Sequence, residues 1–420
     1  MFGLFQRWIV LKGTRFGALA CGDFRLFTFG NSLSLVGTWV QRIGTGWLAW
    51  ESSHSSAWLG LLAFADLFPT VLLAPVAGVI ADRCDKRRVI VYCQFVAMGT
   101  AVLQACLILS HANSMAWLLA VTLVSGIASA LCQPARLSWI STLVPPQRLA
   151  SAVAINSLCF NLARFAGPAL AGAMLLKLDP SALFLLNALS YAIFIVIIFR
   201  IAPGVSKSVA KDPPSHWLRG MTEGFRYLVS DAPLRETFLI LTASAVCIRG
   251  VPDLAPAIAG ELLQRGSQGF ASLVAAAGLG AIAGGVWCSG RDTAKPLARL
   301  IERQVLAASL CTLALALTHD FRLALALFLA MGFSIVVTGI GAQTFIHLSV
   351  PQELRGRVLA LYGVVYRGGP ALSALWLGAG APFLGLRLAL GVGALLCMAA
   401  YCVMAIRVRA RARRQDPPAQ

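Results

Sequence analysis

The 420-residue chain has 58% hydrophobic residues but only 12% charged residues, and its formal net charge is +18. A typical soluble domain carries about 25% charged residues, so this composition excludes an ordinary water-soluble protein. Long, continuous apolar runs recur along the whole sequence, which is typical of a protein with many transmembrane helices. The runs are not alternating, so a β-barrel is not expected.

The apolar runs predict about twelve transmembrane helices. In the first half they cover residues 26–50, 57–81, 88–111, 115–141, 149–178 and 181–201, and in the second half 235–262, 270–290, 298–318, 321–349, 356–379 and 382–406. We expect an all-α membrane protein with an N-terminal segment (1–25), a six-helix bundle (26–201), a linker (202–234), a second six-helix bundle (235–406) and a basic tail (407–420). Within the linker, Leu218 to Val229 predicts a short interfacial helix.

The basic residues are distributed unevenly between the two sides of this arrangement. The side that holds both termini carries 27 of the 35 Lys and Arg residues. The positive-inside rule therefore predicts that both termini are cytoplasmic. Topology explains the net charge, so we do not expect nucleic-acid binding.

Metal and cofactor signals are lacking in the sequence. The eleven Cys form no C-x-x-C pair and the five His do not cluster, so we expect no metal site. No phosphate-binding loop or catalytic constellation is found either, so we expect no cofactor and no enzyme activity.

The two halves of the chain resemble each other. "LVPPQRLASAV" (143–153) has a counterpart in "SVPQELRGRV" (349–358), and "ARFAGPALAG" (163–172) in "YRGGPALSA" (366–374). Internal repeats of this kind are common in transporters, with a substrate site at the repeat interface.

The loop "GVIADRCDKRR" (78–88) resembles the cytoplasmic signature of the major facilitator superfamily, through Gly78, Asp82, Arg83, Arg87 and Arg88. Asp85 stands where that family usually has a second glycine. The resemblance covers nearly the whole chain and implies two six-helix bundles and alternating access. In that account the loop holds a cytoplasmic gate, whereas the alternative is a simple positive-inside anchor.

A second motif resembles the fifth-helix signature of antiporters in that superfamily. Gly167, Pro168 and Gly172 match it, with Gly369 and Pro370 as counterparts in the second half. Small residues allow close helix contact, and proline allows a kink. Together with "TWVQRIGTGWLAW" (38–50) and "PARLSWISTLVP" (134–145), it resembles the exporter branch that contains the enterobactin exporter, a siderophore exporter.

Six charged residues, four Arg and two Asp, lie well inside the predicted spans and away from their ends. Each costs roughly 2.5–3.5 kcal/mol at the centre of a lipid-facing helix, so each needs a wet cavity or a partner. Arg42 and Arg249 lie in the first span of each half, and Arg164 and Arg367 lie in the fifth. We expect these arginines to line one cavity and bind an anionic substrate, because guanidinium binds oxyanions well. The alternative is that each arginine only braces neighbouring helices.

Two acidic residues are the candidates for proton coupling: Asp66 and Asp253. Asp253 follows Arg249 by four residues, so the two can instead pair on one face of a helix. Four aromatic residues are candidates for lining the cavity or anchoring at the membrane interface: Trp39, Trp47, Phe160 and Tyr366.

The resemblance to the exporter branch, together with the arginines inside the spans, implies proton-coupled export of a small, partly anionic, siderophore-like compound. The same resemblance implies the inner membrane of a bacterium as its location. Multidrug efflux, import of organic anions and a membrane sensor that transports nothing remain alternatives. The expected partners are the substrate, protons and membrane lipid, and the protein is expected to work as a monomer.

Overall fold

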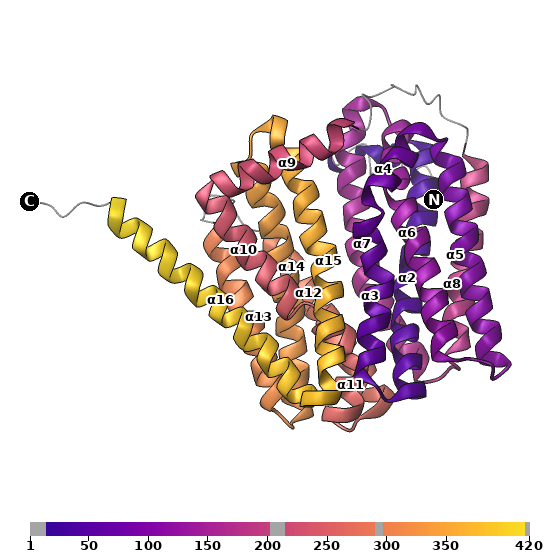
Figure 1. Cartoon of the computed structure of the whole chain (residues 1–420). Coiled ribbons are helices and arrows are strands. Elements are labelled where there is room, and N and C mark those ends of the chain that lie inside the picture. The colour runs from indigo at the N-terminus through magenta and orange to yellow at the C-terminus, as the bar shows by residue number, and fades with distance from the viewer. Residues whose placement is uncertain (1–13, 202–214, 290–296, 416–420) are drawn as a thin grey trace, which may run out of the picture. The chain divides into compact units, whose positions relative to one another are not determined.

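The computed structural model describes residues 14–201, 215–289 and 297–415, which are helical throughout apart from turns and short loops. The all-α class is therefore confirmed for this part of the chain (Figure 1). Residues 1–13 of the expected N-terminal segment, 202–214 of the linker and 416–420 of the tail lie outside the described residues.

The described residues of the first half contain two short 3-10 helices and seven α-helices. They are η1 (Thr14–Ala20), α2 (Gly22–Ser53), α3 (Ser56–Leu72), α4 (Ala74–Arg83), α5 (Lys86–Leu109), α6 (Met115–Leu143), η2 (Pro146–Arg148), α7 (Leu149–Leu175) and α8 (Ser181–Arg200).

The second half begins with the helix that was predicted in the linker. Its elements are α9 (Ser215–Ser230), α10 (Ala232–Cys247), η3 (Val251–Leu254), α11 (Ala255–Ala257), η4 (Ile258–Leu262), α12 (Gly266–Ser289), α13 (Leu297–Leu317), α14 (Phe321–Ser349), α15 (Gln352–Leu384) and α16 (Leu386–Gln415).

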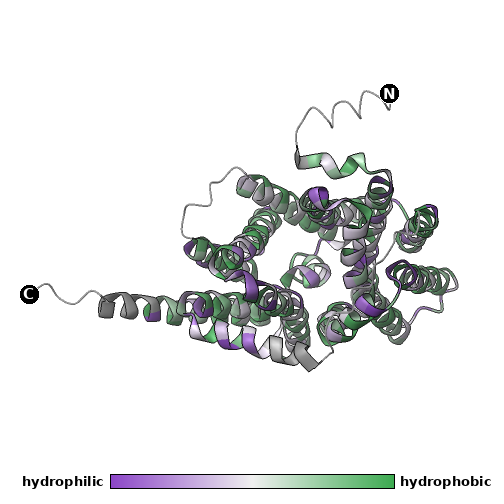
Figure 2. Ribbon diagram, turned by 90° about the horizontal axis from the view of Figure 1, so that it is seen from above, coloured by the Kyte–Doolittle hydropathy of each residue, from purple (hydrophilic) through white to green (hydrophobic). Residues whose placement is uncertain are grey.

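Among the described residues, ten helices are long and apolar enough to cross a membrane, and the bent pair α3 and α4 gives an eleventh. The helices are coloured hydrophobic over most of their length (Figure 2). The helix α2 has 32 residues, which is long enough to span, but it is not among the apolar ones. The count of twelve therefore stays a prediction, and it depends on α2.

The polar content of α2 has a packing reason. Its buried Gln41 accepts a hydrogen bond from Asn187 of α8 at 2.6 Å, and Thr38 lies 3.0 Å from the hydroxyl of Tyr191. The polar side chains of α2 thus find hydrogen-bond partners on α8. Buried polar groups need such partners.

The chain forms two compact units. The first contains residues 1–52 and 68–214, and the second contains 53–67 and 215–420, so most of α3 groups with the second unit. An aromatic core in the first unit places Phe27 edge-on to Trp139, with ring centroids 5.4 Å apart, and against Phe194 at 5.8 Å. The expected bundle boundaries at 26–201 and 235–406 stay predictions.

In the second unit, α12 and α14 pack backbone to backbone. A Cβ added to Gly280 would overlap the carbonyl oxygen of Leu329, and a Cβ added to Gly332 would overlap that of Ala277. Glycine is required at these positions because the two helices approach so closely.

The helix α9 crosses the ends of α10 and α15 (Figure 1). Its Glu223 forms an ion pair with Arg357 near the start of α15, and Leu228 is buried in the apolar core of this unit. The short helix predicted from Leu218 to Val229 is confirmed, and it is attached to the second unit.

Candidate functional site

Arg249 lies at a break in the helix that contains it. The helix α10 ends at Cys247, and the chain becomes helical again only at η3, where the N–H of Asp253 donates to the carbonyl of Gly250 at 3.0 Å. The alternative that Arg249 and Asp253 pair on one face of a continuous helix is wrong, because the helix is interrupted between them. Within the described residues, the Arg249 side chain forms no ion pair or hydrogen bond.

The break is stabilised by side chains of α15. Ser373 accepts a hydrogen bond from the N–H of Gly250 at 2.9 Å, and the indole N–H of Trp376 donates to the carbonyl of Val246 at 2.6 Å. A Cβ at Gly250 would overlap the backbone nitrogen of Ala374. Backbone groups freed inside a membrane need partners, and α15 supplies them, so the break is part of the fold.

The guanidinium of Arg249 lies over the ring of Tyr366 on α15, with 4.3 Å between Cζ and the ring centroid. This distance is typical of a cation–π contact. The ring of Tyr362 lies 5.3 Å from that of Tyr366, and its hydroxyl donates to the carbonyl of Gly339 at 3.3 Å. Arg367, the next residue of α15, is half-buried.

The first unit holds a second cluster of arginine and aromatic side chains. The guanidinium carbons of Arg42 and Arg164 lie 5.4 and 5.8 Å from the ring centroid of Trp39. Phe160 meets the same ring edge-on at 6.4 Å. The helices α2 and α7 thus bring two cations to one indole. Three of the four aromatic residues singled out in the sequence, Trp39, Phe160 and Tyr366, contact these arginines or each other.

The glycines of the Gly-Pro motif set the contacts of these helices. A Cβ at Gly167 of α7 would overlap Cβ of Trp39 on α2, and a Cβ at Gly369 of α15 would overlap Cβ of Ala245 on α10. Pro168 and Pro370 lie inside their helices, and Gly172 is buried. The same helix pair therefore makes the same close contact in each unit.

The arginines of the two halves lie in equivalent helices, but they do not occupy equivalent positions within those helices. Arg164 precedes Gly167 by three residues, whereas the residue three before Gly369 is Tyr366. In the first unit the aromatic ring belongs to the earlier helix and a cation to the later one. In the second unit these roles are exchanged, because Arg249 at the α10 break provides the cation.

Asp66 lies in an α-helix of the second predicted span, as expected, whereas Asp253 lies in a short 3-10 helix. Asp66 lies in α3, half-buried and one turn before Thr70, and Asp253 lies half-buried in η3. Both have interactions with neighbouring residues. A further carboxylate, that of Glu236, is buried in the first turns of α10. Counting two acidic residues inside the spans missed it, since it lies so close to a helix end.

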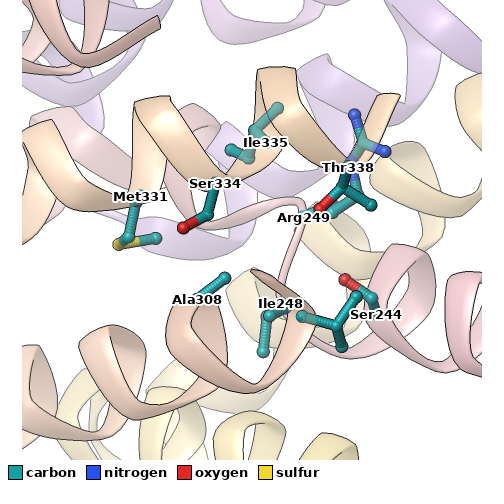
Figure 3. A pocket seen from close by; sticks show the side chains of 9 residues that line it. Ser244, Ile248, Arg249, Ala308, Met331, Ser334, Ile335 and Thr338 are labelled. Carbon is teal, nitrogen blue, oxygen red and sulfur yellow. The ribbon is translucent and has the colours of Figure 1, made fainter. Parts of the chain in front are cut away.

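A cleft in the second unit borders Arg249 (Figure 3). Its walls come from α10, α13 and α14, and they are formed by Ser244, Ile248, Arg249, Val305, Ala308, Met331, Ser334, Ile335 and Thr338. The free space inside is about 10 Å³, about what one water molecule needs. Apart from Arg249, none of these residues was selected from the sequence, because an isolated Ser or Thr in an apolar helix carries no distinctive pattern.

A bend of 54° between α3 and α4 precedes the signature loop, whose first residue is Gly78. Gly78 lies in α4, and a Cβ there would meet no atom within 4 Å. Asp82 and Arg83 are exposed, and Asp82 has no hydrogen bond or ion pair among the described residues.

The rest of the loop has structural roles. Asp85 replaces the family's second glycine, and it caps α5 by accepting a hydrogen bond from the N–H of Arg88 at 3.0 Å. Aspartate is a preferred residue at this position of a helix. Arg87 donates to the carbonyl of Phe199 on α8 at 2.9 Å and lies 5.7 Å from its ring centroid, which ties the loop to α8.

Among the described residues, no group of three or more His, Cys, Asp or Glu side chains is arranged to hold a metal ion. The polar groups that gather are guanidinium, hydroxyl and aromatic side chains. They suit binding of an organic anion better than metal chemistry.

Comparisons of the sequence give the family. A family profile described as transmembrane secretion effector matches residues 13–419. The chain is 28% identical over 184 residues to the staphyloferrin A transporter of Staphylococcus aureus, covering 44% of this chain and 46% of that protein. It is 26% identical over 227 residues to the MFS-type transporter YfiS of Bacillus subtilis, described as uncharacterised, covering 53% of each. The chain thus covers about half the length of these two relatives.

Solved structures agree in fold. A bacterial homologue of the human lysosomal transporter Spinster, inward-facing and unoccupied, superimposes with a TM-score of 0.73 at 16% identity, covering 95% of this chain and 99% of that one. A point mutant of the nucleoside transporter NupG gives a TM-score of 0.71 at 12% identity, covering 91% and 98%. The chain therefore belongs to the transmembrane secretion effector family of the major facilitator superfamily, a family of membrane transporters and not of enzymes.

Proposed function

We propose that this transporter exports a small, partly anionic, siderophore-like compound by proton-coupled alternating access. It would act as a monomer in the bacterial inner membrane, with both termini in the cytoplasm and in contact with membrane lipid. Arg42, Arg164, Arg249 and Arg367 would bind the substrate, and Asp66 and Asp253 would carry the proton.

The observation that supports an anionic substrate best is the state of Arg249. Its half-buried guanidinium contacts Tyr366 but has no carboxylate or hydrogen-bond acceptor among the described residues. A buried cation without an anionic partner is costly, and binding an oxyanion would offset that cost. The likeness to a transporter of staphyloferrin A supports a siderophore as the substrate class.

Flux into proteoliposomes tests direction and coupling together. For purified protein in vesicles that are acidic inside, we expect uptake of external staphyloferrin A in exchange for protons, and a protonophore should abolish it. Uptake only into alkaline vesicles would indicate import by symport. Binding without flux would indicate a sensor, and equal flux of unrelated apolar cations would indicate multidrug efflux. Each of these results contradicts the proposal.

Replacing Asp82 by alanine tests the proposed gate. Because Asp82 is exposed and forms no hydrogen bond or ion pair with a described residue, the Asp82→Ala variant should be inserted and as stable as the wild type, while export falls roughly tenfold, as for a typical conformational coupling. Asp85→Ala is the comparison, since it removes the cap of α5 and should lower stability by about 1 kcal/mol. Unchanged export by Asp82→Ala would argue that the loop only anchors the chain.

A further inference from the structure

The cleft beside Arg249 has a polar lining that comes from two helices. Ser244 lies on α10, one turn before the break, and Ser334 and Thr338 lie one turn apart on α14. Their hydroxyl oxygens point into the space enclosed by the labelled side chains, and Arg249 lies beside Thr338 (Figure 3). No acidic residue lines the cleft.

These three hydroxyls have no hydrogen bond to any described residue. All three side chains are deeply buried, since Ser244, Ser334 and Thr338 are only 4%, 3% and 4% exposed. The three hydroxyl oxygens themselves are not fully enclosed by protein atoms, so a group in the cleft can reach them.

Neighbouring hydroxyls behave differently. Ser309 and Thr312 of α13 donate to the carbonyls of Val305 and Ala308, one turn earlier, each at 2.9 Å. On α10 itself, Thr242 donates to the carbonyl of Phe238 at 2.8 Å. Back-bonding to the helix is therefore available to Ser and Thr in this unit, and the hydroxyls of the cleft do not use it. They are left as donors that face the cleft.

We propose that this cleft is an oxyanion subsite, in which Arg249, Ser244, Ser334 and Thr338 bind one carboxylate or similar group of the substrate. Guanidinium and hydroxyl groups together offer the N–H and O–H donors that an oxyanion accepts. The free space of about 10 Å³ is what one water molecule needs, so it has room for one oxygen of such a group and not for a whole molecule. That the ligand is the transported substrate rests on the proposed function, whereas the preference of the cleft for anions does not.

Residues of α15 would hold the cation of this subsite in place. Ser373 and Trp376 fix the backbone on both sides of Arg249 through Gly250 and Val246, and Tyr366 covers one face of its guanidinium. These contacts hold the N–H groups of the Arg249 guanidinium in position beside the cleft before any ligand binds. Preorganised donors bind a charged group with little loss of side-chain freedom.

Charge-selective modification of a Ser334→Cys variant tests the subsite without knowledge of the ligand. The full-length protein in detergent is treated with sulfonatoethyl methanethiosulfonate or with its trimethylammonium analogue. In each reaction the thiolate forms a disulfide and methanesulfinate leaves. The rates at position 334 are read by peptide mass and compared with those at exposed Cys106 of α5, which corrects for intrinsic reactivity.

We expect the sulfonate reagent to react at position 334 roughly tenfold faster than the cationic one, relative to Cys106, because a positive cleft concentrates anions. Adding Arg249→Gln should remove this preference. Equal rates, faster reaction of the cation, no reaction with either reagent, or a preference that survives Arg249→Gln would overturn the proposal. Since no flux is measured, a failure of export with the preference intact would contradict the proposed function and leave the subsite supported.

Discussion

Replacing Gly280 by alanine is expected to destabilise the protein by about 3 kcal/mol, at the upper end of the range for overpacking. The added Cβ would overlap the backbone carbonyl oxygen of Leu329, and the Cα of that residue is only 3.0 Å away. A side chain could relieve such an overlap by changing its rotamer, but a backbone carbonyl group cannot. The helices α12 and α14 would have to separate, and the reciprocal contact of Gly332 with Ala277 would be lost with them.

Gly285 provides a matched control on the same helix, because a Cβ there meets no atom within 4 Å. Gly285→Ala should leave stability unchanged or raise it slightly, as alanine favours a helix over glycine. Thermal unfolding in detergent separates the two variants. If Gly280→Ala melts together with Gly285→Ala, the close contact of α12 and α14 is not as described.

Replacing Arg387 by alanine should have the next largest effect, about 2–3 kcal/mol, because a guanidinium that donates to several carbonyls is lost. Its Nη1 donates to the carbonyls of Ala316 and Thr318 at 3.0 and 2.8 Å, and its Nη2 donates to that of Leu262 at 3.2 Å. Nη2 also lies 2.9 Å from Nδ1 of His319. Arg387 thus satisfies carbonyl groups at the ends of α13 and η4, which no longer have partners in their own helices.

Two further variants show whether stability depends on the several N–H donors of the Arg387 guanidinium or only on its positive charge. Arg387→Lys keeps the charge but cannot reach the same set of acceptors, so it should recover only part of the stability. Arg322→Ala removes an exposed arginine at the start of α14 and should have little effect. Equal unfolding temperatures for Arg387→Ala and Arg322→Ala would show that these hydrogen bonds do not stabilise the protein.

The all-α membrane fold class and the short helix of the linker could be predicted from the sequence, since both follow from local hydropathy patterns. In the glycine-rich run 276–285, Gly280 and Gly284 face the backbone of α14. The helix α2 shows the limit of hydropathy, because its polar residues are explained by partners on α8 that lie about 150 residues away in the chain.

The site was predicted only in part. Arginines and aromatic residues are easily recognised in an apolar span because their side chains differ from those around them. Arg42, Arg164 and Arg249 do contact aromatic rings. The break beside Arg249 was missed, because it depends on Ser373 and Trp376 of another helix. Arg387 was not among the candidate residues, because its acceptors are backbone carbonyls, which have no signature in a sequence.

The central claim is that arginine side chains select an anionic substrate, and charge-dependent counterflow in proteoliposomes tests it most directly. The rates for the siderophore probe and its fully esterified, neutral analogue are compared in the wild type, Arg164→Gln and Arg249→Gln. We expect the wild type to exchange the anion and not the ester, and each variant to lose exchange of the anion. Equal exchange of anion and ester, with both variants fully active, would contradict the account.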